Sequence, residues 1–292
     1  MALEFRSGYW GDAAARAEFL RFTRQMHRLD LTAWHELGYW DERYTPFSFF
    51  DGGRMVSNVC VYLLPMVVAG RQCVVPQVSA VGTEPEWRRR GLNRELTERA
   101  FAWCRGRAEE FSFLFADEEA FPFYRKCGFR RVGQHRFTAG VPARSAGGSA
   151  RLLDMEQGED RALLVEVAGR RTAVSDRIGC LSVPLLMFHA LYTLRDCAYW
   201  IEEVGVVVFA RVTDGILRVF DVVGPEIPPL DTMLLHLPEF DAGSIELMFM
   251  PDKLQLRSVR ALGGDDPAGT HIGGRGFPYE AGAFRFPFTA HA

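Results

Sequence analysis

The sequence has no apolar run long enough to cross a membrane, no cysteines spaced as C-x-x-C, and no large excess of one charge. A membrane span needs about 20 mostly apolar residues, whereas the longest apolar run, near Val59–Ala69, stops at Gly70-Arg71. The six scattered cysteines disfavour a structural zinc site and indicate buried free thiols. A net charge of −3 argues against binding nucleic acid through bulk electrostatics. The N-terminal residues include no apolar stretch of signal-peptide length, so we expect a soluble cytoplasmic protein with no nucleic acid, membrane or metal among its partners.

Apolar and aromatic residues are abundant, at 48% and 13% of the 292 residues. This composition is typical of a globular protein, and the length corresponds to two domains at roughly 100–200 residues each. One stretch, VPARSAGGSA at Val141–Ala150, is rich in small residues and typical of a linker. We therefore predict a first domain over residues 1–140, a linker over 141–150 and a second domain over 151–292.

Apolar periodicity before the linker predicts the order α-α-β-β-β-α-β-α-β, which is typical of a layered α/β or α+β domain. The expected helices span residues 12–29, 31–39, 91–107 and 118–126, and the expected strands 47–50, 55–68, 73–81, 111–115 and 129–138. The first three strands are expected to form an antiparallel meander because short turns separate them. The second half repeats the order more weakly, and the echo of VGTEP (Val81–Pro85) in VGPEI (Val223–Ile227) favours an internal duplication.

The segment Val78–Leu96 has the residues of an anion site. Its pattern predicts a strand that ends at Thr83, then a proline turn, three arginines, Gly91 and a helix. A helix N-terminus presents N–H groups and the positive end of its dipole, which suits a phosphate. The arginines add charge there, and glycine lets the backbone approach a pyrophosphate. The alternative is an ordinary strand–helix turn with solvated arginines.

The run Arg88–Asn93 resembles the acetyl-CoA signature of the GNAT N-acetyltransferases, Q/R-x-x-G-x-G/A. In the context V-x-P-x-x-R of that family, Pro85 and Arg88 fall in register, and Val81 lies just before them. The sequence departs at Asn93, whose side chain adds bulk where the family has Gly or Ala. Together with the next motif, the resemblance implies acetyl-CoA as co-substrate, without a metal, and these cofactor-binding residues: Val81, Thr83, Arg88, Arg89, Arg90, Gly91, Leu92, Asn93 and Asp117.

A second segment, DEEAFPFYRKCGF at Asp117–Phe129, resembles the element N-x-x-A-x-x-x-Y-x-x-x-G-F of the same family. Ala120, Tyr124, Gly128 and Phe129 fall in register, while Asp117 stands where Asn is usual. The two motifs together imply the GNAT acyl-CoA N-acyltransferase fold, an α/β (α+β) fold with a mixed, mostly antiparallel central sheet, in two tandem copies. The second copy is expected to be degenerate, because PEIPPLDTML replaces the arginines and glycine of the first.

In this family an amine attacks the thioester directly, so the resemblance implies an acid for the thiolate and a base for the amine. Tyr124 is the candidate acid, since a neutral phenol can donate to sulfur; the alternative is a packing aromatic. A backbone N–H near Val81 is expected to polarise the carbonyl. The base stays open among water held by Gln77 or Ser79, an acidic side chain, or a terminal carboxylate on Ala292, which serves as base in a multi-domain branch of the family.

The expected function is therefore N-acetylation of a primary amine from acetyl-CoA. The alternative is a non-catalytic acyl-CoA-binding or sensing protein. The acceptor stays open among small amines, aminoglycoside-like compounds, amino acids and peptides, and a homo-oligomer is one possible assembly. An aromatic and acidic patch is a candidate acceptor site, with a core plus a polar rim as its alternative: Trp34, His35, Tyr39, Trp40, Asp41, Glu42, Phe47 and Phe49.

Overall fold

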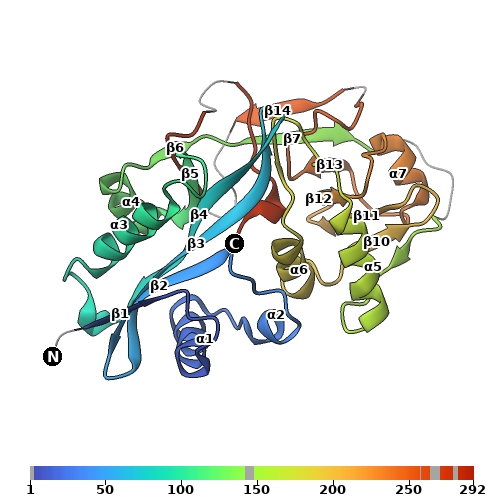
Figure 1. The fold of residues 1–292 in the computed structure, drawn as a ribbon. Helices are drawn as coiled ribbons and strands as arrows, with labels where there is room; N and C mark the ends of the chain where they lie inside the picture. Colours follow the sequence, from blue (N-terminus) through green and yellow to red (C-terminus); the bar gives the residue numbers. More distant parts are fainter. Residues whose placement is uncertain (1–2, 142–147, 257, 264–269, 279–281) are drawn as a thin grey trace.

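Two mixed β-sheets form the two halves of the molecule, and helices cover them (Figure 1). The computed structural model describes residues 3–141, 148–256, 258–263, 270–278 and 282–292. Most of the expected linker, residues 142–147, lies outside the described residues. Within them, no helix combines the length and apolar character needed to cross a bilayer.

The first sheet has the strand order β1-β2-β3-β4-β5-β15-β6, and β9 pairs with β3. Neighbours are antiparallel except β4 and β5, which are parallel. The expected meander is confirmed in β2, β3 and β4. The strands are β1 (Glu4–Ser7), β2 (Tyr44–Asp51), β3 (Arg54–Val68), β4 (Arg71–Thr83), β5 (Ser112–Asp117), β6 (Arg130–Val132), β9 (Ile178–Cys180) and β15 (Thr270–Arg275).

The helices of the first half begin and end close to their expected positions. They are α1 (Ala13–His27), α2 (Thr32–Glu36), α3 (Leu92–Cys104) and α4 (Phe121–Lys126), with 3-10 turns η1 (Pro85–Trp87) and η2 (Glu118–Ala120). Helix α1 begins where Asp12 accepts hydrogen bonds from the N–H groups of Ala14 and Ala15. Its apolar stripe, which includes Phe19 and Phe22, is buried in the core.

The second sheet has the order β14-β7-β13-β12-β11-β10-β8, with β12 and β13 parallel. Its strands are β7 (His135–Gly140), β8 (Arg151–Leu152), β10 (Ala198–Ile201), β11 (Val206–Thr213), β12 (Ile216–Val223), β13 (Ser244–Leu247) and β14 (Arg260–Gly263). Its helices are α5 (Gly158–Gly169), α6 (Val183–Leu191), α7 (Leu230–His236) and the 3-10 turn η3 (Phe288–Ala290). The two sheets share a pairing order: an antiparallel hairpin, a helix, then a parallel neighbour.

Each sheet also contains strands from the other half of the chain: β9 and β15 in the first sheet, and β7 in the second. Strand β7 lies between β13 and β14 of the second sheet, and β15 lies between β5 and β6 of the first. The single strand expected over residues 129–138 is therefore wrong, because the chain leaves the first sheet after Val132 and joins the second at His135. A division into domains at residues 141–150 stays a prediction, and these strands cross it.

The glycine-rich run within β15 allows that strand to fit between its neighbours. A Cβ atom on Gly274 would lie 2.8 Å from side-chain carbons of Val132 and Phe277. Real Cβ contacts are longer, so a side chain at this position would force the neighbouring residues to move. The run thus has a packing role.

Candidate active site

Strands β4 and β5 part in the middle of the first sheet. Their parallel pairing is confined to Gln77 with Phe113 and Val78 with Leu114. Directly beyond, β4 bulges: Ser79 pairs with Cys60 and Gly82 with Asn58, so that two residues of β4 oppose one of β3. Such a bulge re-aims the backbone, and Ala80 within it has a φ of 45°. The two strands therefore leave an opening at the centre of the sheet.

A cavity of about 280 Å³ occupies this opening. Its wall combines the bulge, Asp117 at the end of β5, Tyr124 on α4 and the last two residues, His291 and Ala292. Of the expected site residues, Val81, Asp117 and Tyr124 line it. The others, Thr83 and Arg88 to Asn93, follow along the end of β4 and the turn into α3. The site thus has a cavity and an adjoining turn.

Tyr124 lies on the cavity wall with 7% of its surface exposed. Burial raises the pKa of its phenol well above the usual range, and the nearby Cys127 and Asp117 raise it further. The group is therefore protonated at neutral pH and has a proton to donate. Its ring packs against Phe123 and Phe129, with centroids 5.2 and 6.1 Å away.

The turn before α3 has the geometry expected of an anion site. Gly91 is the N-cap residue with a φ of 78°, a conformation that favours glycine, and no side chain caps this helix end in the described structure. The first N–H groups of α3 are therefore available to a ligand. Arg88 donates to the Thr83 carbonyl at 3.1 Å, and Arg90 to the Glu86 carbonyl at 3.0 Å.

Asn93, the departure from the family signature, points back into the sheet. Its Oδ1 accepts hydrogen bonds from the hydroxyls of Ser57 and Thr83, at 2.6 and 2.8 Å. The two hydroxyls also contact each other at 2.9 Å. The side chain therefore joins α3 to β3 and β4. The bulk that the sequence led us to expect at Asn93 thus faces Ser57 and Thr83.

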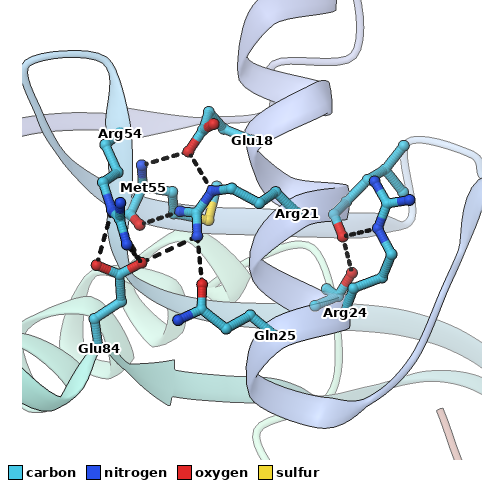
Figure 2. Close-up of polar contacts among 9 residues, drawn as sticks. Glu18, Arg21, Arg24, Gln25, Arg54, Met55 and Glu84 are labelled. Carbon is cyan, nitrogen blue, oxygen red and sulfur yellow. Dashed lines mark hydrogen bonds and ion pairs between the residues drawn. The ribbon is translucent and has the colours of Figure 1, made fainter.

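A buried carboxylate holds the start of the turn in place. Glu84, with 1% of its side chain exposed, pairs with Arg54 at 3.0 Å and with Arg21 at 3.1 Å (Figure 2). Arg21 belongs to α1 and also contacts Glu18 and Gln25. One carboxylate thus connects the turn, the β2–β3 hairpin and α1. Sequence reasoning missed this cluster, because the partners lie 30 and 63 residues away in the chain.

The expected aromatic acceptor patch is core with a polar rim, in which Glu42 is exposed and Asp41 is half-buried. Trp34 is buried, and its indole donates to the Pro184 carbonyl at 2.8 Å, so it packs the first half against α6. Phe47 and Phe49 are also buried. None of the expected patch residues lines the cavity, whose aromatic residues include Tyr44, Phe115 and Tyr124. The core alternative is the one that the structure supports.

Sequence reasoning also missed His27, which ends α1 and lines the cavity. Burial lowers its pKa, opposed in part by a hydrogen bond from the ring to the Ala80 carbonyl. The imidazole is therefore neutral at neutral pH and has one nitrogen able to accept a proton. Within the described residues, no three His, Cys, Asp or Glu side chains gather as metal ligands.

Comparison with known proteins agrees with this geometry. Residues 23–132 match a family described as the acetyltransferase (GNAT) domain. No curated protein matches the sequence. Among solved structures, a probable N-acyltransferase of unknown function from Enterococcus faecalis is 14% identical, with a TM-score of 0.61 over 94% of this chain and 72% of that chain.

Two further structures share the fold over nearly the whole chain. Eis1 from Mycobacterium abscessus is 18% identical, with a TM-score of 0.56 over 93% of this chain and 73% of its own. A GCN5-related N-acetyltransferase from Kribbella flavida is 16% identical, with a TM-score of 0.54 over 92% and 71%. The expected fold class is confirmed, and residues 23–132, which match the acetyltransferase (GNAT) domain, include Tyr124 and the turn into α3.

Proposed function

We propose that this protein transfers an acetyl group from acetyl-CoA to a primary amine. The observation that carries the proposal is that the bulge of β4 and Tyr124 line one opening in the sheet, and that β4 leads from this opening to the open N-terminus of α3. The pyrophosphate of CoA would bind at the turn, to backbone N–H groups of Gly91, Leu92 and Asn93 and to the arginines before them. The thioester would then lie along β4 in the cavity.

The reaction needs one bond made and one broken. The amine nitrogen attacks the thioester carbon, the C–S bond breaks, and CoA leaves as a thiolate. The N–H of Val81, at the bulge, is assigned to the carbonyl oxygen, whose negative charge grows during attack. Tyr124 protonates the thiolate, whose pKa is near that of cysteine, about 8.5. Asp117, at the exposed rim, favours a cationic acceptor through its charge.

The amine must lose a proton, because a free alkylamine has a pKa of about 10. His27, on the cavity wall, is placed to accept it. Its imidazole is neutral and lies at the end of α1.

The second half, residues 151–292, is proposed to be a degenerate copy of the first. Its hairpin β11–β12, helix α7 and parallel strand β13 repeat the order β3–β4, α3 and β5. Helix α7 begins after Pro228 and Pro229, which lack N–H groups, so no phosphate turn like that at Gly91 can form there.

The proposal is tested by titrating acetyl-CoA into the protein and by measuring free thiol release with cadaverine, kanamycin, lysine and a tetrapeptide as acceptors. Acetyl-CoA binding with amine-dependent thiol release supports it. Tight binding without release on any amine would favour the non-catalytic acyl-CoA sensor. An absence of binding would exclude both. The double variant Arg88→Ala with Arg90→Ala serves as control and should weaken binding, with a smaller effect at high salt.

A further inference from the structure

The second sheet has the same opening as the first, at the same place. Strands β12 and β13 pair in parallel from Ile216 to Val219, and β12 then bulges, because Val219 pairs with Ala210 but Asp221 with Phe209. In the first sheet the corresponding parting and bulge enclose the cavity. The opening of the second sheet instead contains a segment of the chain itself.

That segment is the C-terminal tail, defined as residues 284–292, which runs between the two halves (Figure 1). Its turn η3 contacts β12, and the N–H of Phe288 donates to the Met248 carbonyl at 2.9 Å, just beyond β13. The ring of Phe288 lies against Phe220 in the bulge, with centroids 5.0 Å apart. Near the start of the tail, Arg285 pairs with the buried Glu246 of β13 at 3.1 Å.

The tail is also attached to Asp221. Its carboxylate is buried and pairs with Arg171 at 2.8 Å, where the two side chains are 1% and 3% exposed. It also accepts hydrogen bonds from the Thr289 hydroxyl at 2.5 Å and from the N–H of Val222 at 2.8 Å. Burying an ion pair this deeply is costly and seldom adds net stability. A role in fixing the position of the tail accounts for its presence.

Two residues beyond Thr289, the tail reaches the other sheet. The ring of His291 stacks on Phe115 of β5, with centroids 4.0 Å apart. The N–H of Ala292 donates to Oε1 of Gln77 in β4 at 3.2 Å. Both residues line the cavity that contains Tyr124. Gln77 is fully buried, and its Nε2 has no hydrogen-bond partner among the described residues, so it also presents a donor for a bound group.

We propose that Asp221 and Thr289 are positioning residues: the Asp221–Arg171 pair holds the tail in the second sheet's opening so that His291 and Ala292 form the acceptor wall of the first. The inference rests on the proposed function. It gives the second half a task in catalysis that needs no phosphate turn. The tail takes, in the second sheet, the place that the proposed cofactor takes in the first.

The test is Thr289→Val, which removes the hydroxyl, keeps the shape and leaves the Asp221–Arg171 pair intact. Amide hydrogen exchange in the tail should accelerate about tenfold or more, because a hydrogen bond to a charged group is lost. The amides of β11 to β13 should keep their protection from hydrogen exchange. With the best amine of the acceptor panel, kcat/KM should fall by a similar factor, while the KM for acetyl-CoA stays within about twofold. Thr289→Ser should restore the slow exchange of the tail and the wild-type kcat/KM.

Thr172→Val is the matched control, because the Thr172 hydroxyl bonds to the Pro225 carbonyl at 2.6 Å and not to the tail, although the residue adjoins Arg171. Unchanged exchange in Thr289→Val would overturn the proposal. So would faster exchange with unchanged kinetics, since the tail would then have no part in the cavity's function. If no amine is acetylated, the proposed function fails, and the exchange measurement still decides whether Asp221 holds the tail.

Discussion

The side-chain oxygen of Asn93 accepts a hydrogen bond from the Ser57 hydroxyl at 2.6 Å, and this contact joins the proposed cofactor helix to the neighbouring strand β3. The residue that departs from the GNAT signature is thus part of the framework beneath the turn. Its side chain is directed to Ser57 and Thr83, so the backbone N–H groups at the start of α3 keep their access to a phosphate.

Asn93→Ala, which restores the family's residue, should destabilise the protein by about 1–2 kcal/mol, because two hydroxyls lose their acceptor. The dissociation constant for acetyl-CoA should stay within about threefold, since the backbone binds the phosphates. Urea unfolding and calorimetric titration measure the two quantities. Ser57→Ala should lower stability comparably. Unchanged stability with much weaker acetyl-CoA binding would instead place the amide in contact with the cofactor.

Tyr124→Phe should lower kcat at least about tenfold, because the thiolate loses its proton donor. The KM for acetyl-CoA should change little, since the ring keeps its packing. Steady-state rates of thiol release measure both constants. Tyr62→Phe is the control: that phenol is equally buried but contacts Ser182, outside the cavity. A Tyr124→Phe enzyme with the wild-type rate would remove the phenol from the mechanism.

Glu84→Gln should weaken acetyl-CoA binding and destabilise the fold by about 1–3 kcal/mol, because Arg21 and Arg54 lose the charge that holds the start of the turn. Gln keeps the size of the side chain, so the effect reports charge. Unfolding and acetyl-CoA titrations are compared with those of Glu86→Gln, an exposed carboxylate two residues along. Equal effects in the two variants would show that the buried cluster around Glu84 (Figure 2) does not hold the turn in place.

Stability should fall as pH drops from about 6.5 toward 3, with His189 contributing. Burial, together with the charge of His291, lowers the pKa of His189 to about 3, although a bond to the His291 carbonyl opposes the shift. Between these pH values His189 is protonated in the unfolded chain but not in the folded chain. The free energy of unfolding therefore falls by at most about 1.4 kcal/mol for each unit that the pH is lowered. His189→Gln should flatten the slope of unfolding free energy against pH. Parallel curves for the variant and the wild type would contradict this assignment.

The sequence was most informative where the chemistry is carried by consecutive residues. The turn at Arg88–Asn93 and the segment around Tyr124 each lie within a short window, and the short turns between β-rich runs predicted the meander of β2 to β4. Secondary structure of this kind depends on local periodicity, which a single sequence displays.

The missed features all depend on residues far apart in the chain. No local pattern connects Glu84 with Arg21, or Asp221 with Thr289, because only the tertiary fold brings these side chains together. The place of β15 was missed for the same reason: its glycines fit a space made by Val132 and Phe277, which periodicity cannot reveal. His27 closes a helix whose extent was predicted, but nothing in the sequence directs it to the cavity.

The placement of β15 has a consequence for the nascent chain. As the ribosome extends the polypeptide, β5 and β6 emerge early, but the strand that pairs with both is made only when residues 270–275 appear. Until then each presents a bare edge open to other chains. Strand β7 likewise has no partner strand until β13 and β14 have been made. A polypeptide stopped just before residue 270 therefore has an incomplete first sheet, and a chaperone that shields the edges of β5 and β6 would raise the yield of folded protein.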